Sequence, residues 1–279
     1  MPIKAIYNNL AEQYATADCF GSITDSHQYA IKQIHDLNLN DLDNLNILDF
    51  GVGDGAFLKK LYSHTPHAAF TGIDISSEML KIARSALPLN AIEASASEAS
   101  RFLPKNSQNL VLAHFINAYL PIPVLFHQAN QLTTDDGYFS LITTTYESFP
   151  VAQQHLADFI SQDSFLSSIV GHYYKAVIKN TTVASGEEEL LTSFEKHQFQ
   201  VISHQRLHIP ITLNHIEELA LFGIEGTWFL NSLSIRMLPK NFLLQRIKRL
   251  FSKIFTFPYQ DTHVIDIVLA KKVPKEKLN

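Results

Sequence analysis

A glycine-rich turn directly after a short apolar run is the feature that most limits what this chain can fold into. The run is 46–50 (NILDF), and glycines follow at alternate positions in the segment GVGDG at 51–55. An apolar run that stops at glycines is typical of a buried parallel strand entering a tight turn. Glycines let the backbone bend sharply and approach a ligand closely, and the free N–H groups of a following helix can bind that ligand. We therefore expect a ligand site at this turn.

Apolar runs alternate with helical patterns on either side of this turn. We expect seven strands, at 46–50, 69–74, 90–94, 109–114, 137–144, 200–211 and 263–270. Parallel strands need crossover connections, and right-handed crossovers place helices on both faces of a sheet. The sequence therefore predicts an α/β fold with a doubly wound, seven-stranded, mostly parallel sheet.

The remaining segments divide around this sheet. We expect an N-terminal helical lid at 1–45, the sheet domain at 46–211, a helical cap inserted at 212–262 between the last two strands, and the last strand and tail at 263–279. The N-terminal helices should break near Gly21, because glycine favours a helix end. Between the fifth and sixth strands we expect a helix at 152–169 and an extended segment at 173–183.

Composition and charge exclude several classes of protein. The net charge is −5, from 22 Lys and Arg against 27 Asp and Glu, which gives no broad cationic surface for nucleic acid. The single cysteine, Cys19, cannot form an internal disulfide and fits a reducing compartment. No apolar run reaches the roughly 18 residues of a membrane-spanning helix, and no secretory signal is visible. We expect a cytoplasmic protein without a nucleic-acid partner.

Asp74 ends the second expected strand, where a carboxylate can accept hydrogen bonds from the ribose hydroxyls of an adenosine cofactor. A dinucleotide-binding fold would have the spacing G-x-G-x-x-G, with a pyrophosphate at the helix that follows. Here the spacing is G-x-G-x-G, and Asp49 stands just upstream, where its charge would repel phosphates. The pattern disfavours NAD and suits a ligand that carries an ammonium group.

These motifs resemble those of the Rossmann-like (class I) methyltransferases that use S-adenosylmethionine (SAM). The first motif of that family is an acid, one apolar residue and G-x-G-x-G, as at 49–55, and its second motif is similar to GIDISSEMLKIAR at 72–84. The resemblance implies a small-molecule methyltransferase of Rossmann-like fold, with SAM as its cofactor.

The resemblance also implies a set of cofactor-binding residues. They are Tyr14, Asp49, Gly51, Val52, Gly53, Gly55, Asp74, Ile75, Met79, Ser97, Glu98 and His114. In this set Asp49 and Gly51 would lie near the methionine part of SAM. Asp74 would hold the ribose hydroxyls, and Ile75 and Met79 would flank the adenine.

The third motif departs from the family pattern. That motif has an acid–alanine pair at a fixed distance before an acid that opens the fourth strand. Asn109 stands in place of the second acid, and counting back from it puts Ser97 and Glu98 where the pair should be. We expect one of these two side chains to meet the adenine amine.

Methyl transfer is a displacement at a sulfonium carbon, so the protein must align a nucleophile and exclude water. His114 at the end of the fourth strand is a candidate general base for a hydroxyl acceptor, and a histidine that lines the pocket without moving a proton is the favoured alternative. Tyr14 is a candidate to cover the cofactor, with core packing as the alternative. The segment HFIN at 114–117 stands where methyltransferases of the amino groups of nucleobases or glutamine have an N-P-P-Y-like sequence, which argues against those acceptors. We favour oxygen as acceptor over nitrogen or carbon.

Three alternatives stay open. A methyltransferase-like fold could bind SAM or S-adenosylhomocysteine (SAH) as a non-catalytic sensor or partner-binding module. The basic amphipathic segment 246–255 could touch an anionic membrane, although a solvated face is favoured. The aromatic residues of the cap could line a chamber for a partly apolar substrate, or only pack the cap. His204 and His208 share one face of a strand but lack further ligands nearby, so no metal site is expected.

Overall fold

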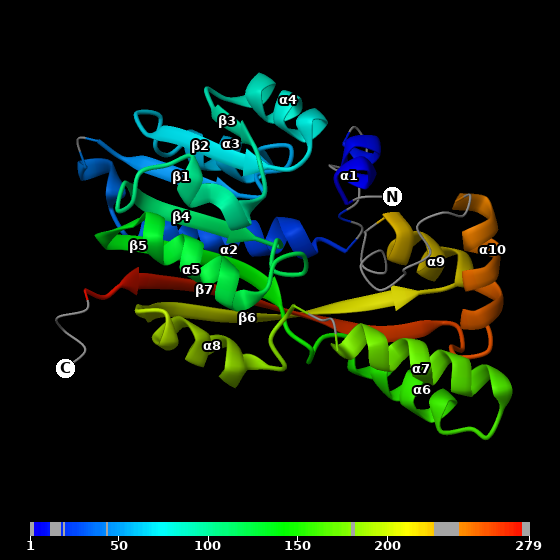
Figure 1. The fold of residues 1–279 in the computed structure, drawn as a ribbon. Helices are drawn as coiled ribbons and strands as arrows, with labels where there is room; N and C mark the ends of the chain where they lie inside the picture. The colour runs from blue at the N-terminus through cyan, green and yellow to red at the C-terminus, as the bar shows by residue number, and fades with distance from the viewer. Residues whose placement is uncertain are drawn as a thin grey trace.

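A seven-stranded sheet forms the centre of the protein (Figure 1). This computed structural model describes residues 3–11, 18, 20–42, 44–179, 182–225 and 240–274. The strands are β1 (Asn46–Phe50), β2 (Ala69–Asp74), β3 (Asn90–Glu93), β4 (Gln108–His114), β5 (Thr133–Thr144), β6 (Phe199–Leu213) and β7 (Tyr259–Lys272). Their order is β3-β2-β1-β4-β5-β7-β6, and β7 runs antiparallel to both neighbours. The predicted doubly wound, mostly parallel α/β sheet is confirmed.

The central strands are mainly apolar because both faces of the sheet are covered. On β1, Leu48 and Phe50 enter the apolar cluster on one face, whereas Ile47 enters the cluster on the other. One face is packed by α2 (Ser22–His35), α3 (Ala56–Tyr62) and α4 (Ser77–Ala86), and the other by η3 (Ala96–Arg101), α5 (Ile122–Leu132) and α8 (Glu187–Lys196). Two buried faces are what a doubly wound sheet requires.

The N-terminal helix α1 (Ile3–Leu10) packs against α4 at one end of the molecule's core (Figure 1). The Ser76 hydroxyl, which also caps α4, donates to Asn8 Oδ1 at 2.6 Å. Lys4 forms an exposed ion pair with Glu93 at the end of β3. This hydrogen bond and this ion pair hold α1 beside the C-terminal ends of β2 and β3.

The next helix begins where the glycine predicts a break. Gly21 has a left-handed φ of 73° immediately before Ser22, the first residue of α2. The Asp18 carboxylate accepts hydrogen bonds from the N–H groups of Ile23 and Thr24, at 3.0 and 2.8 Å. This side chain supplies partners that the first turn of a helix lacks. A short helix, η2 (Leu39–Asp41), then leads into β1.

Strands β6 and β7 are longer than expected and form a ribbon that projects past the sheet (Figure 1). They stay paired out to Leu213 and Tyr259, whereas the pairing of β5 with β7 ends at Thr144 and Ile265. Helices α6 (Pro150–Ile160), α7 (Phe165–Lys179), α9 (Ile216–Glu225) and α10 (Lys240–Phe251) gather around the projecting end. We call the projecting ribbon and these four helices the ribbon lobe.

The ribbon lobe has its own small apolar cluster, formed by Ile211, Leu213, Leu219 and Tyr259. Two separate insertions build it, since α6 and α7 precede β6 while α9 and α10 follow it. The expected extended segment at 173–183 is wrong as far as Lys179, because α7 continues to that residue. The absent side chain of Gly171 lets α7 approach α6, where a Cβ atom would lie 2.9 Å from Ile160.

Candidate functional site

Three glycines of the turn after β1 have the left-handed backbone conformation, and the first of them, Gly51, has a φ of 71°. Gly53 has a φ of 55° and Gly55 a φ of 78°. A Cβ atom at Gly55 would lie 3.0 Å from the Cβ of Ala83, so glycine is needed there for α4 to pack against the turn. At Gly53 the space is open, and the nearest heavy atom would be 3.9 Å from a Cβ atom. Gly53 therefore faces free space rather than the core.

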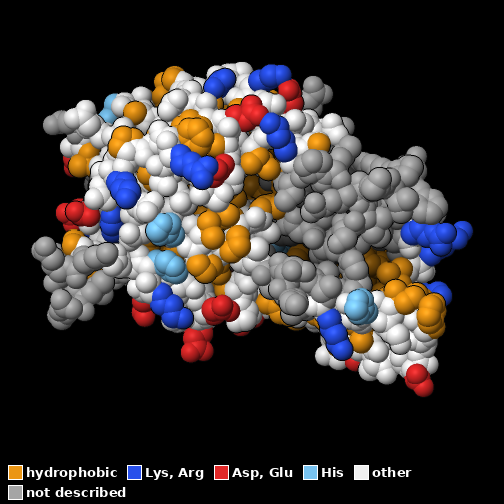
Figure 2. Space-filling view, viewed as in Figure 1, with side chains coloured by type: hydrophobic (Ala, Val, Ile, Leu, Met, Phe, Trp, Pro, Cys, Tyr) orange, Lys and Arg blue, Asp and Glu red, His pale blue; other side chains and the backbone are white. Residues whose placement is uncertain are grey.

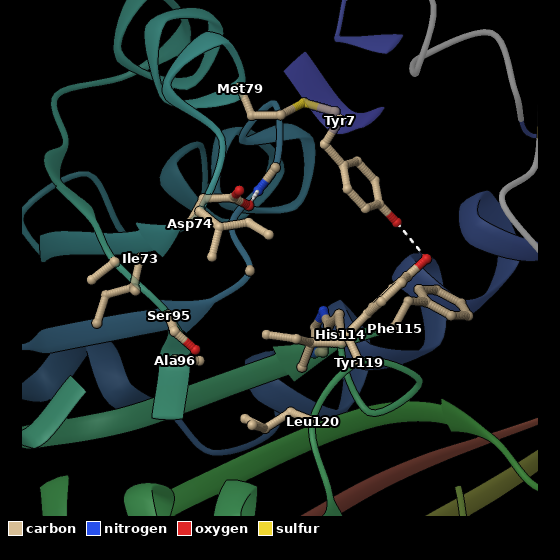
Figure 3. A pocket seen from close by; sticks show the side chains of 15 residues that line it. Tyr7, Ile73, Asp74, Met79, Ser95, Ala96, His114, Phe115, Tyr119 and Leu120 are labelled. Atoms are coloured by element: carbon tan, nitrogen blue, oxygen red, sulfur yellow. Dashed lines mark hydrogen bonds between the residues drawn. The ribbon is translucent and has the colours of Figure 1, made fainter. Parts of the chain in front are cut away.

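That space is a cavity at the C-terminal ends of β1, β2 and β4 (Figure 3). Its volume is about 240 Å³, whereas one water molecule needs about 10–15 Å³, so it has room for an organic ligand. The lining residues that the structure describes are Tyr7, Gly51, Gly53, Ile73, Asp74, Ile75, Met79, Ala94, Ser95, Ala96, His114, Phe115, Ile116, Tyr119 and Leu120. Six of the twelve predicted cofactor residues are among them: Gly51, Gly53, Asp74, Ile75, Met79 and His114.

The other predicted residues lie elsewhere. Asp49 and Val52 are buried beneath the turn, and Gly55 packs on α4. Ser97 and Glu98 are in η3 and do not line the cavity. Tyr14 lies outside the described residues.

Asp74 lines the cavity, and Asp49 lies buried behind it. The Asp74 carboxylate accepts hydrogen bonds from the N–H groups of Ser76 and Gly53, at 2.8 and 2.9 Å. Burial nevertheless raises the pKa of Asp74 above its ordinary value. Burial, followed by repulsion from Asp74, raises the pKa of Asp49 well above its ordinary value. Two buried carboxylates that oppose each other's charge favour a cationic ligand.

Ser95 and Ala96 occupy the edge of the cavity where Ser97 and Glu98 were expected. Ser95 precedes η3, and its hydroxyl accepts from the Ser97 N–H at 3.3 Å and lies 2.7 Å from the Ser97 hydroxyl. The two residues that face the cavity thus lie two positions before Ser97 and Glu98, which the count back from Asn109 gives. The spacing Ser95-x-x-Glu98 is a helix-start signal that could have located it.

Asn109 contributes to the sheet rather than to the cavity. Its Oδ1 accepts a hydrogen bond from the backbone N–H of Asn46, at 2.8 Å. This bond ties the start of β4 to the start of β1, at the end of the sheet away from the glycine turn. An amide oxygen supplies the needed acceptor, so the missing acid does not weaken the cofactor site.

His114 forms part of the cavity wall at the end of β4 (Figure 3). Its ring packs edge-on against Phe57, with centroids 4.3 Å apart, and lies 5.9 Å from the ring of His27. Its Nε2 atom is 3.1 Å from the hydroxyl of Ser140, and its buried Nδ1 has no hydrogen-bond partner among the described residues. Burial, followed by repulsion from His27, lowers the pKa of His114 well below the ordinary value, so the imidazole is neutral at pH 7.

Tyr7 and Tyr119 meet across the cavity (Figure 3). Tyr7 comes from α1 and Tyr119 from the loop after β4, and the Tyr7 hydroxyl donates to the Tyr119 hydroxyl at 2.6 Å. The two rings are edge-on, with centroids 5.7 Å apart. The N-terminal helix thus contributes a side chain to the cavity wall.

The segment that follows β4 supplies four further lining residues. They are Phe115, Ile116, Tyr119 and Leu120, and Phe115 has a left-handed φ of 57°. A bulky residue in this conformation is uncommon and marks a constrained backbone. The sequence holds no periodic signal for such a turn.

The described residues contain no cluster of three His, Cys, Asp or Glu side chains suited to a metal ion. His204 Nε2 instead lies at hydrogen-bonding distance from Asp266 Oδ1, at 2.8 Å, and its Nδ1 lies 3.5 Å from Glu187 Oε1. No helix in the described part of the chain is long and apolar enough to cross a membrane.

Comparisons with known proteins agree with this geometry. Residues 47–137 match the family described as "Methyltransferase domain". No curated protein sequence is similar enough to match. Among solved structures, a putative methyltransferase from Bacillus halodurans has 14% identity and a TM-score of 0.54, over 88% of this chain and 99% of that one.

Two further solved structures are similar in fold. A putative sarcosine dimethylglycine methyltransferase from Galdieria sulphuraria has 10% identity and a TM-score of 0.55, over 90% of this chain and 86% of that one. A possible histamine N-methyltransferase from Thermotoga maritima has 16% identity and a TM-score of 0.50, over 96% and 99% of the two chains. At such identities the likeness concerns the fold.

The sheet order and the cavity at its strand ends define an α/β protein of the class I methyltransferase type. Residues 47–137 match the methyltransferase domain family, in agreement with the motifs there that predicted SAM as the cofactor. The residues present fit this cofactor. Gly53 leaves open space beside the turn, and the carboxylates of Asp49 and Asp74 suit a ligand with sulfonium and ammonium charges.

Proposed function

We propose that this domain transfers a methyl group from SAM to an oxygen atom of a small, partly apolar molecule. The observation that carries the proposal is one cavity that joins the carboxylate of Asp74 to the imidazole of His114. The cofactor supplies an electrophilic methyl group on a sulfonium sulfur. Asp74 would hold its ribose hydroxyls, Met79 and Ile75 would flank its adenine, and Ser95 would face its amino group.

Apolar side chains support a partly apolar acceptor. Phe115, Ile116 and Leu120 line the cavity. Between the sheet and the ribbon lobe, Phe222 packs edge-on against Phe20 and Phe149, with centroids 5.4 and 6.0 Å apart. Ligand sites are mostly apolar with a few placed polar groups. Two proteins of similar fold are named for amine substrates. For this chain, the HFIN segment at 114–117 argues against the amino groups of nucleobases or glutamine, and oxygen is the proposed acceptor.

The segment before β1 would act as a lid over the cofactor, with Tyr7 as its described contact and Tyr14 as a further candidate. Contacts from Lys4 and Asn8 to the sheet domain support this role. We also propose the division of the chain into a lid at 1–45, the sheet domain at 46–211, a cap at 212–262 and the last strand and tail at 263–279. A cytoplasmic location is part of the proposal too, because a chain with one cysteine suits a reducing compartment.

Surface charge supports a small molecule rather than nucleic acid as partner. On the face drawn in Figure 2, positive and negative side chains are interspersed over the sheet domain and form no continuous basic surface. The basic segment at 246–255 is partly neutralised, because Lys248 pairs with Glu217 at 3.4 Å. A solvated face therefore remains the favoured reading of that segment.

Calorimetric titration with SAH tests the cofactor assignment. Asp74→Ala should weaken binding at least tenfold, because the ribose hydroxyls lose charged acceptors worth about 1.5–3 kcal/mol. Glu78→Gln is the matched control, since Glu78 pairs with Lys81 on the exposed side of α4. Equal SAH affinity in Asp74→Ala and wild type would refute the site.

A non-catalytic SAM-binding or SAH-binding module is the second candidate. Ser95 favours it, because a hydroxyl replaces the carboxylate of the family pattern at the adenine edge. Both candidates bind the cofactor, so turnover must separate them. Formation of SAH from SAM in the presence of phenols and carboxylic acids would reject the non-catalytic function.

A further inference from the structure

Ser140 and His114 form a polar pair inside the sheet. In the parallel register Ser140 lies opposite Leu112, two residues before His114, so both side chains point to the same face. The Ser140 side chain is fully buried, and its oxygen lies 3.1 Å from His114 Nε2. No other hydrogen bond of this hydroxyl occurs in the described part of the chain.

The position of the proton on the His114 ring follows from the hydrogen bonds open to the Ser140 hydroxyl. A serine hydroxyl has one hydrogen to donate, and leaving it unused in a buried site costs about 1–3 kcal/mol. If Nε2 carried the proton, it would donate to the serine oxygen, and the serine hydrogen would have no acceptor. If Nε2 is bare, the Ser140 hydroxyl donates to it and this loss is avoided. The neutral ring of His114 therefore carries its proton on Nδ1.

Nδ1 is then an N–H donor that the described protein leaves unused. This atom is buried and has no partner among the described residues, although the ring lines the cavity. Nε2 is turned to Ser140 in the sheet, so Nδ1 is the ring nitrogen that has no partner among the described residues. Buried donors without protein partners are uncommon and call for a specific explanation.

We propose that His114 binds the acceptor oxygen as a neutral hydrogen-bond donor in a tautomer fixed by Ser140, and that the acceptor binds as an oxygen anion such as a carboxylate or an acidic phenol. This inference rests on the proposed transfer to oxygen. An N–H donor stabilises an anionic oxygen and cannot remove a proton from a hydroxyl. His114 is thus a donor, in place of the general base that the sequence offered as a candidate.

The chemical step balances without a base. A lone pair of the anionic oxygen forms the new O–CH3 bond while the C–S bond breaks, and the electrons of that bond stay on sulfur. The charges of the oxygen anion and the sulfonium cancel, and no proton moves. Ser140 touches neither reactant, so it is a positioning residue.

NMR of histidine labelled with ¹³C and ¹⁵N tests the tautomer directly, in the full chain with SAH at neutral pH. His114→Asn identifies the His114 signals by their loss. The expected wild-type spectrum has a protonated Nδ1 and a bare Nε2. Ser140→Ala should move the proton to Nε2, and Ser140→Cys, a weaker donor of closer size, should populate both forms. Ser203→Ala, on β6, is the control and should leave the His114 signals unchanged. A wild-type proton on Nε2, or an unchanged tautomer in both Ser140 variants, would overturn the proposal.

Ligand binding is tested on the same sample with benzoate, 4-nitrophenolate and benzylamine as probes. The two anions should shift the His114 Nδ1–H signal, and benzylamine should not. If neither anion shifts the signal, or only benzylamine does, the assignment of the acceptor as an oxygen anion fails. If the anions shift it but no acceptor is methylated in any assay, the donor assignment stands and the proposed methyl transfer fails.

Turnover of a methylated probe separates a donor from a base. The Nδ2 amide of asparagine can donate near the Nδ1 position but cannot accept a proton. His114→Asn should therefore keep the KM of the acceptor within about threefold of wild type, whereas His114→Ala should raise it at least tenfold, because the charged oxygen loses a hydrogen bond worth about 1.5–3 kcal/mol. Equal changes of KM in the two variants would overturn the donor role.

Discussion

The turn after β1 allows a sharp test, because two of its glycines have the same backbone conformation but different surroundings. Gly53→Ala requires a left-handed backbone for alanine, which costs about 1–2 kcal/mol. The added Cβ atom meets no protein atom closer than 3.9 Å, so no further loss of stability is expected. The same atom enters the cavity and should crowd the bound cofactor.

Gly55→Ala is the matched comparison. It carries the same backbone cost, and its Cβ atom would lie 3.0 and 3.1 Å from the Cβ and Cα atoms of Ala83. Overpacking of this kind costs about a further 1–3 kcal/mol. The total loss of stability is about 2–5 kcal/mol, against about 1–2 kcal/mol for Gly53→Ala.

Urea denaturation and calorimetric titration with SAH measure the two effects separately. Gly53→Ala should unfold near the wild-type midpoint and bind SAH about tenfold to a hundredfold more weakly, since crowding of 1–3 kcal/mol has that effect on affinity. Gly55→Ala should unfold at lower urea, with the SAH affinity of its folded form within about threefold of wild type. The reasoning is refuted if Gly53→Ala binds SAH normally, or if the two variants are equally stable.

Three further changes test other parts of the structure. Burial, aided by the charge of Lys60, lowers the pKa of His27 from 6.5 to about 4, so the folded state resists protonation and loses stability as pH falls from about 6.5 to 4. His27→Gln should remove up to about 3 kcal/mol of this pH dependence, measured from urea midpoints. An unchanged dependence of stability on pH in the variant would contradict this. Arg206→Met should cost about 1.5–3 kcal/mol in the same assay, because the fully buried carboxylate of Asp266 loses its guanidinium partner and keeps only the hydrogen bond to His204, and adding Asp266→Leu should restore part of the loss. Tyr7→Phe should speed SAH release about fivefold in stopped-flow measurements, while Tyr29→Phe, on the exposed side of α2, should not.

The strands and the glycine turn could be predicted because their signals are local. Asp74 was found by its place at the end of a strand, and β2 does end there. Ser97 and Glu98 were expected to face the cavity, but Ser95 and Ala96 line it, because a count from Asn109 assumes a fixed connection between η3 and β4. The start of η3 is instead set by the hydroxyl of Ser95. A helix N-cap residue therefore locates such a segment better than a residue count does, wherever the connecting loop can change length.

Contacts between distant segments could not be predicted. Nothing in the pattern of α7 reveals that it packs on α6 beside the ribbon, because the approach depends on Gly171 and on a partner helix. The pairing of Ser140 with His114 depends on the register of two strands. Propensity and periodicity describe elements one at a time and do not encode such neighbours.

The two insertions of the ribbon lobe share one two-stranded stem. Before Ile265, back to Tyr259, β7 pairs with β6 alone, because its pairing with β5 ends at Ile265. At the root of this stem Arg206 joins the carboxylates of Asp266, Glu147 and Glu187. Recombination between relatives would therefore have to move α6, α7, α9 and α10 as one block. A chimera made by exchanging the whole stem could acquire another acceptor while it keeps its own cofactor machinery.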